Sequence, residues 1–578
     1  MKSLAVFLTG LLLVGCLKDS SEAESTFYPY SFLNELKDQR LISLKEDLDR
    51  LQPPSFPGEL AFDSGWKFQL GDPAEGLEVD VKIISGIEIN LPHREEYPNH
   101  PFWYFKRIHF LDSGFLYVKA DDGSQLYING NRVKQVYPNI FPVDSGDWDL
   151  TIRVLNNAMR GGLQQVEFST YDGYQDYRLK YKNYQIRYDL IKKVLLKRDV
   201  DNQLIEHAKR LISSDQVDKE VEVLWRAFEE LPYLIGPFVV KDENGNWHIQ
   251  IITDSNLPVT LRWGDLPDAL TNDLSGSGKL VDFAFDKIKA GQLVHYRIFS
   301  GNTFSPLYSL DTRLHDRFSF NVWADSQSGW AAFSKTMSII DGGNDNFGIG
   351  IGDLVSNGSD STHWMKFLEI LSRSADKRPY CLIPGNHDYD GYYEDLRPVN
   401  YYRFTGNNRN YQSWTYDNAA FIALDPNENF PIGIHQETEQ YRWFISELES
   451  EAWKKATWRF VLMHQPPFSQ GWEGYHGDSI IRDLLEPILE SAKVDFVLSG
   501  HTHDYERLSR QYGTQKVTFF VLGGAGGGLE PVESSDYPHM DTVIKSHHFG
   551  RFTIEASKLL FKAIDLYGNT MDSYSQVK

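Results

Sequence analysis

Five short groups of residues in the second half of the chain carry side chains that bind metal ions. They are Asp325-Ser326-Gln327, Gly352-Asp353, Gly385-Asn386-His387-Asp388, His464 and Gly500-His501-Thr502-His503. Carboxylates, imidazoles and carboxamide oxygens are common protein ligands for divalent metal ions. Two carboxylates together with several imidazoles and amide oxygens indicate a centre for two ions rather than one.

Each group directly follows a short apolar run. These runs, with the first polar residues, read FNVWAD, FGIGIGD, CLIPGNHD, FVLMH and FVLSGHTH. Runs of this kind are typical of buried strands in an α/β sheet, whose ends converge at one edge. His501 and His503 lie two residues apart, so an extended segment would let both reach a common site. Gly385 and Gly500 permit the sharp backbone turns that such loops need.

This series of motifs, in this order, resembles the calcineurin-like metallophosphoesterase superfamily. GHTHDYER, VLMHQPP and the region before Asp325 are most similar to purple acid phosphatases, and the resemblance covers roughly residues 235–575. It implies a metal-dependent phosphoric ester hydrolase of the acid phosphatase type. Such an enzyme hydrolyses phosphate monoesters with a hydroxide that bridges two metal ions.

The resemblance also implies which residues hold the two ions. The first site would contain Asp325, Gln327, Asp353 and His503, and the second Asp353, Asn386, His464 and His501. Asp353 is shared because the two oxygens of one carboxylate can serve two ions.

Three further residues are predicted to be catalytic. By the resemblance, His387 faces the substrate and either stabilises the phosphoryl oxygens or protonates the leaving group, which calls for a pKa near the working pH. Asp388 either orients His387 or caps its loop. His476, in GWEGYHGDS, is similar to a second substrate-facing histidine of purple acid phosphatases, and the alternative is an ordinary loop histidine.

The chain departs from purple acid phosphatases at the first metal site. Ser356 stands where that family has a tyrosine, three residues after the bridging aspartate, and Gln327 stands where most of the superfamily has a histidine. The missing phenolate argues against tyrosinate-bound ferric iron. Two aspartates, a glutamine and one histidine favour Mn²⁺ or Fe²⁺, with Zn²⁺ as the alternative. Ser356 and Asn357 either touch a metal-bound water or shape the loop.

The N-terminus is typical of a targeting segment rather than of folded structure. Lys2 precedes an apolar stretch, and Leu13-Val14-Gly15-Cys16 matches the bacterial lipoprotein cleavage box. We therefore expect a signal peptide over residues 1–16 and a lipid on Cys16. The protein would then be anchored in the bacterial cell envelope, at the periplasmic or surface face of the outer membrane. An ordinary secretory signal is the alternative.

The only other cysteine, Cys381, is expected to be a buried core residue.

With 578 residues the chain is too long for one compact domain, so a multidomain protein is expected. The succession of strand-like and helical runs predicts a tether and helix (17–56), a β-sandwich (57–172), a helical connector (173–232), a second β-sandwich (233–312) and a C-terminal α/β domain (313–578). Residues 57–172 look like jelly-roll modules of the galactose-binding type, and residues 233–312 resemble the fibronectin III-like sandwich of purple acid phosphatases. The family resemblance implies that residues 313–578 are the metallophosphoesterase domain, a β-sandwich flanked by helices. Asn129-Gly130 predicts a tight hairpin in the first sandwich.

Two segments outside the sandwiches have helical periodicity. Leu41, Leu44, Leu48 and Leu51 share one face, as do Leu204, Ala208, Leu211 and Ile212. The first segment could form a dimer seam, but its shortness favours packing against its own chain, and the second helical segment is a candidate neighbour.

The net charge of −22 argues against binding to nucleic-acid duplexes. Three functions remain in competition. The first is an extracytoplasmic phosphomonoesterase. The second is a phosphodiesterase on the same metal centre, acting on nucleotides or phosphorylated glycans. The third is a surface glycan-binding lipoprotein whose catalytic domain is vestigial. The 57–172 sandwich would bind a glycan or serve a purely structural role.

Overall fold

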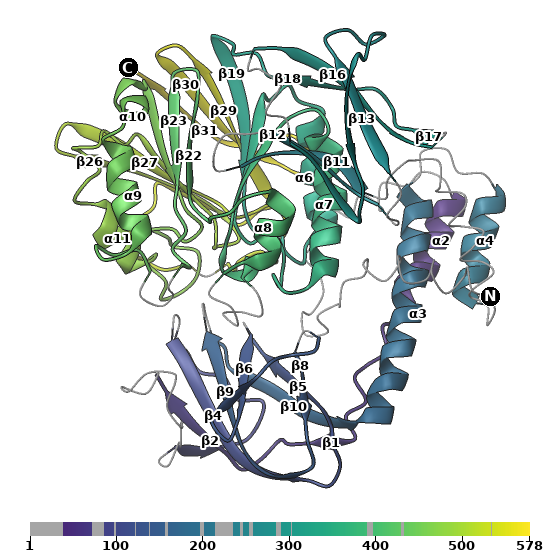
Figure 1. The fold of residues 1–578 in the computed structure, drawn as a ribbon. Coiled ribbons are helices and arrows are strands. Elements are labelled where there is room, and N and C mark those ends of the chain that lie inside the picture. The colour runs from purple at the N-terminus through teal and green to yellow at the C-terminus, as the bar shows by residue number, and fades with distance from the viewer. Residues whose placement is uncertain are drawn as a thin grey trace.

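The structure is a computed structural model (Figure 1). It describes residues 39–578 apart from 72–85, 98–99, 122, 138, 157–159, 197–201, 214–234, 243–246, 254–257, 285–290, 302, 390–396, 429–432 and 533. The predicted signal peptide, the tether with Cys16 and the last part of the helical connector lie outside the described residues. None of the described helices is long and apolar enough to cross a membrane.

The C-terminal domain is built on two facing sheets. One has nine strands in the order β15 (Leu280–Ala284), β12 (Trp247–Ile252), β11 (Ile235–Lys241), β21 (Tyr380–Ile383), β20 (Phe347–Ile351), β19 (Arg317–Trp323), β29 (His548–Glu555), β30 (Lys558–Asp565) and β31 (Thr570–Val577). The other has seven, in the order β22 (Gln412–Tyr416), β23 (Ala419–Ala423), β24 (Trp458–Leu462), β25 (Phe496–Ser499), β27 (Gln515–Leu522), β26 (Tyr505–Tyr512) and β28 (Thr542–Ile544). Strands β19, β20 and β21 are parallel, as are β23, β24, β25 and β27.

Aromatic side chains fill the space between these two sheets. The ring of Phe320 is stacked between those of Phe347 and Phe552, with ring centroids 4.9 and 5.0 Å away. Helices α6 (Trp330–Asp341), α7 (Ser361–Ala375) and α8 (Val399–Thr405) cover the outer face of the nine-stranded sheet. Helices α9 (Glu439–Leu448), α10 (Glu451–Lys455) and α11 (Ser479–Leu485) cover the seven-stranded sheet. This is the predicted sandwich flanked by helices.

The nine-stranded sheet extends across the expected domain boundary at residues 312–313, because β11, β12 and β15 precede this boundary and belong to the same sheet as β19, β20 and β21. Strands β13 (Val259–Gly264), β14 (Asn272–Gly276), β16 (Leu293–Ser300), β17 (Thr303–Phe304) and β18 (Tyr308–Asp311) form a sheet that packs on β11, β12 and β15 through a shared apolar core. However, β11 also pairs in parallel with β21 at Val240 and Tyr380. An exposed strand edge is a ready template for pairing, so the smaller sandwich is continuous with the catalytic sheet.

The N-terminal sandwich has a four-stranded and a six-stranded sheet. The first has the order β1 (Leu60–Ala61), β10 (Leu163–Thr170), β5 (Gly114–Ala120), β8 (Ile140–Val143). The second has the order β3 (Ile87–Ile89), β2 (Trp66–Leu70), β4 (His100–Phe110), β9 (Gly146–Asn156), β6 (Ser124–Ile128), β7 (Asn131–Val133). The predicted hairpin joins β6 to β7, and Asn129 and Gly130 both have positive φ, at 49° and 78°. Two such residues are what a tight hairpin with this twist requires.

A helical segment joins this sandwich to the rest of the chain. Helix α3 (Tyr171–Leu196) follows β10 directly and packs with α2 (Gln39–Asp49) and α4 (Asn202–Ser213) through Leu44, Leu48 and Leu204. The expectation that the first helix packs on its own chain is therefore confirmed. Near its start, α3 presents Tyr174 and Tyr177 to the sandwich. Figure 1 shows the sandwich held by α3 below the catalytic domain.

Asp376, at the C-terminus of α7, makes the stability of the catalytic domain depend on pH. Its Oδ1 is buried without a hydrogen bond to any described residue, and burial raises the pKa of Asp376 from 3.8 to about 7. An acid whose pKa is raised by folding stabilises the folded state in its protonated form, so stability falls as pH rises from about 4 to 7.

We therefore expect Asp376→Asn to unfold at the same temperature as the natural chain at pH 4 and at a higher temperature at pH 8. One pKa unit corresponds to about 1.4 kcal/mol, so a gain of a few kcal/mol is the upper limit. Thermal unfolding followed by circular dichroism measures it, with the exposed Asp483→Asn as control. A gain that does not vary with pH would contradict the assignment.

Candidate metal centre

The predicted metal ligands come together at one edge of the catalytic sandwich. Each follows the C-terminal end of a parallel strand: Asp325 and Gln327 after β19, Asp353 after β20, Asn386 after β21, His464 after β24, and His501 and His503 after β25. The first three strands belong to the nine-stranded sheet and the last two to the seven-stranded sheet. The site therefore lies where the ends of both sheets meet, as expected for the carboxyl ends of parallel strands.

Asp353 is at the centre of this cluster. One ligand atom from each of Asp353, His464 and His501 lies within 4.8 Å of the other two. The Nε2 of His464 is 3.1 Å from Asp353 Oδ2. On the other side, Nε2 of Gln327 is 3.1 Å both from Asp353 Oδ2 and from His503 Nε2. Asp353 thus contacts members of both predicted sites, as a bridging carboxylate would.

Asp325 lies between the same histidines. Its Oδ1 is 3.6 Å from Nε2 of His503 and 3.8 Å from Nε2 of His464. Its Oδ2 accepts a hydrogen bond of 2.8 Å from the backbone N–H of His501. One oxygen of this carboxylate is therefore fixed by the backbone, and the other is directed into the cluster.

The backbone is strained at three of the predicted ligands. Asp325, Asp353 and His501 have φ of 61°, 49° and 75°, in the left-handed region that side chains other than glycine rarely adopt. Such conformations cost about 1–3 kcal/mol each and persist only where the surrounding structure holds them, which is typical of functional sites.

Two glycines allow the loops to approach each other. Gly352 has φ of 78°, and a Cβ there would lie 2.5 Å from Nδ1 of His464. A Cβ on Gly385 would overlap both Oδ1 and the backbone N of Asp353. The loops after β20 and β21 can therefore meet only because both positions lack a side chain.

Backbone carbonyls orient two of the imidazoles. Nδ1 of His464 donates to the carbonyl of Ile351 at 2.8 Å, and Nδ1 of His503 donates to that of Gly528 at 2.6 Å. A carbonyl can only accept, so these bonds fix the tautomer and leave both Nε2 atoms as lone-pair donors. This is how metal-binding histidines are commonly held.

The donor atoms of this cluster fit a metal centre. Among the described residues, Asp325 Oδ1, Asn386 Oδ1, Gln327 Oε1 and His464 Nε2 are buried and make no hydrogen bond. Unpartnered buried polar atoms cost free energy and are rare in proteins. Several of them converging on one point indicate that cations complete the site.

The electrostatics of the cluster point the same way. Burial lowers the pKa of His501 to about 3 and that of His503 to about 4, so both imidazoles are neutral, the form that binds metal ions. Burial would also lower the pKa of His464, but Asp353 and Asp325 raise it to about 10. Burial likewise opposes ionisation of Asp353, yet His464 and His387 hold its pKa below the usual range. Positive charge is therefore strongly favoured between the two carboxylates.

At the first site, the structure places Ser356 away from a ligand role. Its Oγ is 2.7 Å from Oγ of Ser328, while Asn357 accepts hydrogen bonds from the backbone N–H and hydroxyl of Ser359. These contacts agree with the alternative that both residues shape the loop. The side chain of Gln327 lies in the cluster, and because amide nitrogen and oxygen occupy nearly equivalent positions, it can offer either atom there.

Of the predicted catalytic residues, His387 lies at the cluster. Its backbone N–H donates to Asp353 Oδ1 at 2.9 Å, its Nδ1 is 3.1 Å from the carbonyl of Ser356, and its Nε2 is 3.8 Å from Asp353 Oδ2. Asp388 is placed differently. Its carboxylate accepts from the backbone N–H groups of Leu354, Val355 and Gly385 at 2.8–3.2 Å. Asp388 therefore anchors the loops rather than orienting the imidazole of His387.

His476 does not join the cluster through any contact of its ring. Its Nδ1 lies 2.8 Å from Oγ of Ser535 and 3.0 Å from the carbonyl of Tyr537, so its loop is tied to the segment before β28. This position agrees with the alternative prediction that His476 is an ordinary loop histidine. The residues just before it, Trp472 and Tyr475, instead pack their rings beside His501. No motif in the sequence predicts either contact.

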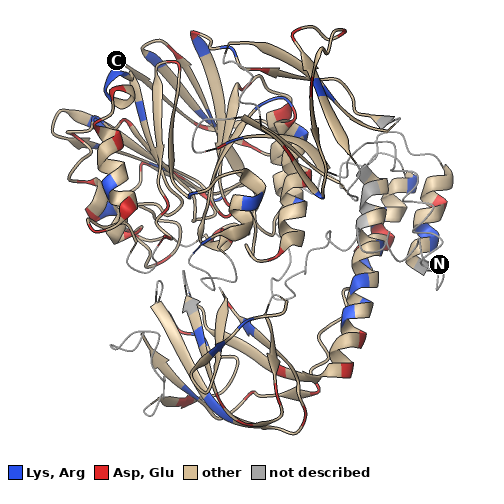
Figure 2. Cartoon of the chain, viewed as in Figure 1, with Lys and Arg blue, Asp and Glu red and all other residues tan. Residues whose placement is uncertain are grey.

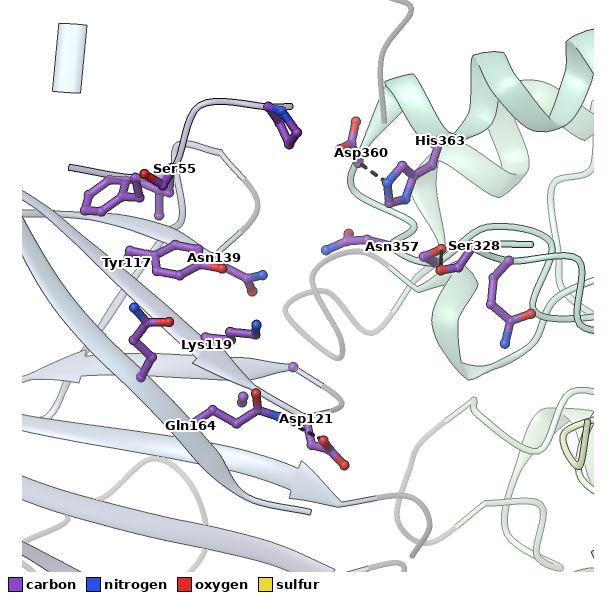
Figure 3. Close-up of a pocket in the computed structure, with 18 of the residues that line it drawn as sticks. Ser55, Tyr117, Lys119, Asp121, Asn139, Gln164, Ser328, Asn357, Asp360 and His363 are labelled. Carbon is purple, nitrogen blue, oxygen red and sulfur yellow. Dashed lines mark hydrogen bonds and ion pairs between the residues drawn. The ribbon is translucent and has the colours of Figure 1, made fainter. Parts of the chain in front are cut away.

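The cluster opens into a pocket of about 930 Å³ (Figure 3). Gln327, His387 and His503 contribute to its lining, together with His363 from α7. The opposite wall comes from the N-terminal sandwich, including Tyr117, Lys119, Asn139 and Gln164. Figure 3 shows these side chains facing Ser328 and Asn357 across the pocket. The sequence analysis made no prediction about this contact, because nothing in the residues of the sandwich indicates its neighbour.

Comparison with known proteins decides the family of this site. Residues 318–505, which contain all the predicted metal ligands, match the family model described as calcineurin-like phosphoesterase. Residues 318–505 are a calcineurin-like phosphoesterase domain. The superfamily predicted for this part of the chain is thereby confirmed.

Individual relatives agree with this assignment. The chain is 27% identical over 255 residues to purple acid phosphatase 22 of Arabidopsis thaliana, covering 41% of this chain and 56% of the relative. It is 28% identical over 162 residues to purple acid phosphatase 1 of Ipomoea batatas, covering 26% and 33%. The chain thus spans about half or less of the length of these curated relatives. A purple acid phosphatase from yellow lupin (Lupinus luteus) seeds shares the fold, with a TM-score of 0.52, 13% identity and coverage of 84% and 93%.

Gly385→Ala is expected to disrupt metal binding, and circular dichroism shows whether the domain stays folded. Its methyl group would displace the Asp353 carboxylate, and changes next to metal ligands cost about 10–100-fold in affinity. Titration calorimetry of the metal-depleted protein with Mn²⁺ measures the loss. Gly528→Ala is the matched control, since a Cβ at Gly528 meets nothing within 4 Å. Equal Mn²⁺ affinity in the two variants would contradict the proposed geometry.

Proposed function

We propose that the protein is an extracytoplasmic, metal-dependent phosphatase that hydrolyses phosphate monoesters at the edge of the catalytic sandwich. The observation that carries the proposal is the convergence of Gln327, His464 and His501 on Asp353, with donor atoms of several predicted ligands buried and unpartnered. The curated relatives named above are purple acid phosphatases, which supports the monoester class.

The chain's residues divide the work of binding two cations. Asp325, Gln327 and His503 would hold one ion, Asn386, His464 and His501 the other, and Asp353 both. Ions bound there supply an acidified water as nucleophile and neutralise phosphoryl charge. The left-handed backbone at Asp325, Asp353 and His501 and the hydrogen bonds to His464 and His503 fix the ligands in advance. Such preorganisation means that little has to rearrange during the reaction.

His387 is placed to act on the substrate rather than on the ions. Its side chain is about one-fifth exposed and lines the pocket, while its backbone is held by Asp353. Nδ1 donates to the carbonyl of Ser356, so Nε2 is the atom that can hold or transfer a proton at the leaving-group oxygen. Asp388 supports this role indirectly, because it fixes the loops on which His387 and Asp353 lie.

A phosphodiesterase is the second candidate, and one observation favours it. The pocket of about 930 Å³ extends well beyond the volume of a phosphate group, so a substituent on each side of the phosphorus can be accommodated. Nucleotides or phosphorylated glycans would then be the substrates. Both candidates use the same metal ligands and differ in whether one or two organic groups are attached to phosphorus.

The remaining parts of the proposal concern the metal and the location. Carboxylates and an amide at the first site favour Mn²⁺ or Fe²⁺, with Zn²⁺ as the alternative. One relative, from Arabidopsis thaliana, is named Fe(3+)-Zn(2+) purple acid phosphatase 12, a name with two different metal ions.

The lipoprotein box ending at Cys16 supports a lipid anchor at the outer membrane of a bacterial envelope. In the view of Figure 2, basic residues are interspersed with acidic ones, which accords with a protein that does not bind nucleic-acid duplexes.

Asp353→Asn should abolish turnover while leaving the fold intact, because asparagine lacks the charge and second oxygen needed to bridge two cations. We expect kcat/KM for an aryl phosphate in Mn²⁺ to fall by about 10³-fold or more. The exposed Asp483→Asn is the control. Activity equal to that of the control would refute the dimetal mechanism.

The corresponding bis-aryl diester, assayed in parallel with the natural chain, decides between the two candidate functions. Preference for the monoester is expected, and preference for the diester would identify the phosphodiesterase.

The iron-loaded protein is expected to lack the strong visible band that a tyrosinate-to-iron bond produces. Ser356 occupies the position of the tyrosine, and its hydroxyl is hydrogen-bonded with that of Ser328, so no phenol stands at that position. The visible absorption spectrum after loading with iron and oxidation tests this. Ser356→Tyr serves as the comparison variant, and a strong band in the natural chain would contradict the expectation.

A further inference from the structure

The wall of the pocket that faces the metal ligands belongs to the N-terminal sandwich, and strand alternation explains its composition. Leu116 and Val118 of β5 point into the sandwich core, so Tyr117 and Lys119 point outward. On the neighbouring strand β10, Gln165 pairs with Lys119 and Glu167 with Tyr117. These outward side chains line the pocket. Lys119, Gln165 and Glu167 are not part of the sandwich core, whereas Tyr117 also packs against Phe56 and the tyrosines of α3.

This wall is held against the catalytic domain by specific contacts. Gln135, between β7 and β8, donates a hydrogen bond of 3.4 Å to Ser359 in the loop that follows Asn357. Arg178 of α3 lies over the ring of Tyr137, with the guanidinium carbon 3.9 Å from the ring centroid. Asn139, near Tyr137 in the sequence, and Asp360, beside Ser359, line the same pocket. The pocket is thus bounded by two domains in contact.

The polar groups of the wall suit a hydroxyl-rich molecule. Gln165 Nε2 donates to Glu167 Oε1 at 2.6 Å, and Gln164 Nε2 donates to Asp121 Oδ1 at 2.9 Å. An amide and a carboxylate together offer more hydrogen-bonding positions than the one bond between them uses. Neighbouring hydroxyl groups of a bound sugar can donate to the carboxylate and accept from the amide. The ammonium group of Lys119 makes no ion pair with any described residue and brings three further donors.

Charge and stacking argue against other leaving groups. The carboxylates of Asp121 and Glu167 balance the cations of Arg94 and Lys119 among the lining residues, so a second phosphate group gains little there. The ring of Tyr117 is already stacked on Phe56 at a centroid distance of 5.4 Å, which leaves fewer free ring faces for a nucleobase. A neutral polyol fits this wall better than a nucleotide.

We propose that the outward face of β5 and β10 is the leaving-group subsite of the metal centre and that the substrate is a phosphorylated carbohydrate. This inference rests on the proposed phosphatase function. The phosphoryl group lies beside His387 and the cations, and the sugar hydroxyls bind Lys119, Gln165 and their neighbours across the pocket. Hydrolysis breaks the bond between phosphorus and the leaving oxygen, adds water, and releases the free sugar and phosphate.

The test is a double variant on this face, Lys119→Ala with Gln165→Ala. Its matched control is Lys67→Ala with Gln69→Ala on β2, which carries the same two residue types outside the sandwich core and away from the pocket. The natural chain and both variants are assayed in Mn²⁺ against p-nitrophenyl phosphate and a panel of hexose 1- and 6-phosphates. Loss of two polar contacts is expected to lower kcat/KM for the preferred hexose phosphate by about tenfold or more.

The pattern across substrates separates the outcomes. The inference expects p-nitrophenyl phosphate to be affected less than about threefold by the pocket variant, and neither substrate to be affected by the control. An equal loss on both substrates, or no preference of the natural chain for any hexose phosphate over p-nitrophenyl phosphate, would overturn the subsite while leaving the phosphatase intact. No hydrolysis of any phosphoester by the metal-loaded natural chain would instead refute the proposed function.

A binding measurement checks the subsite without turnover. Titration of the Asp353→Asn protein with the preferred hexose phosphate is compared with titration of the same protein carrying Lys119→Ala and Gln165→Ala. The subsite predicts an affinity about tenfold weaker for the second protein. Equal affinities would overturn it.

Discussion

The burial of two carboxylates side by side is the constraint on which the catalytic domain depends. Asp325 and Asp353 are almost completely buried, within reach of the same imidazole nitrogens. Buried anions are costly unless paired with positive charge. Burial accordingly raises the pKa of Asp325 well above its usual range, while the pKa of His464 rises to about 10 between the two carboxylates. A site with this potential and with unpartnered donor atoms is built for cations, and the strand ends, left-handed residues and glycines all serve to bring those donors together.

That arrangement needs a rigid frame, because strained ligands relax unless their surroundings hold them. The rings of Phe421 and Phe460, from the seven-stranded sheet, pack edge-on against the ring of Phe320 in the nine-stranded sheet and tie the two sheets together. Buried carboxylates then fix the loops: Asp388 binds the backbone after Asp353, and Glu506 binds the hydroxyl of Ser469 at 2.6 Å and the backbone of Gln470 at 2.7 Å. The sheets thus set the positions of the strand ends, and loop carboxylates set the direction of the side chains.

The metal ligands could be predicted from the sequence because each one lies next to the strand that positions it. A ligand such as His464 directly follows the apolar strand that positions it, so the strand and the donor appear together in the sequence. The sequence leaves two roles open for Asp388, because the backbone N–H groups that donate to its carboxylate, at Leu354 and Val355, are over thirty residues away in the chain. The pairing of β11 with β21 was missed for the same reason: it joins Val240 to Tyr380, and no local pattern marks which strand will cover an edge.

The same distinction separates reaction type from selectivity. The metal ligands determine what chemistry is available, and one set of ligands on one fold can serve many substrates. Selectivity must come from side chains that touch the rest of the substrate, and in this chain the surface opposite the ligands is contributed by another domain. Lys119 and Gln165 lie on the outward face of a sandwich whose core is complete without them. They can therefore vary without loss of the fold, while the buried carboxylates at the other wall cannot.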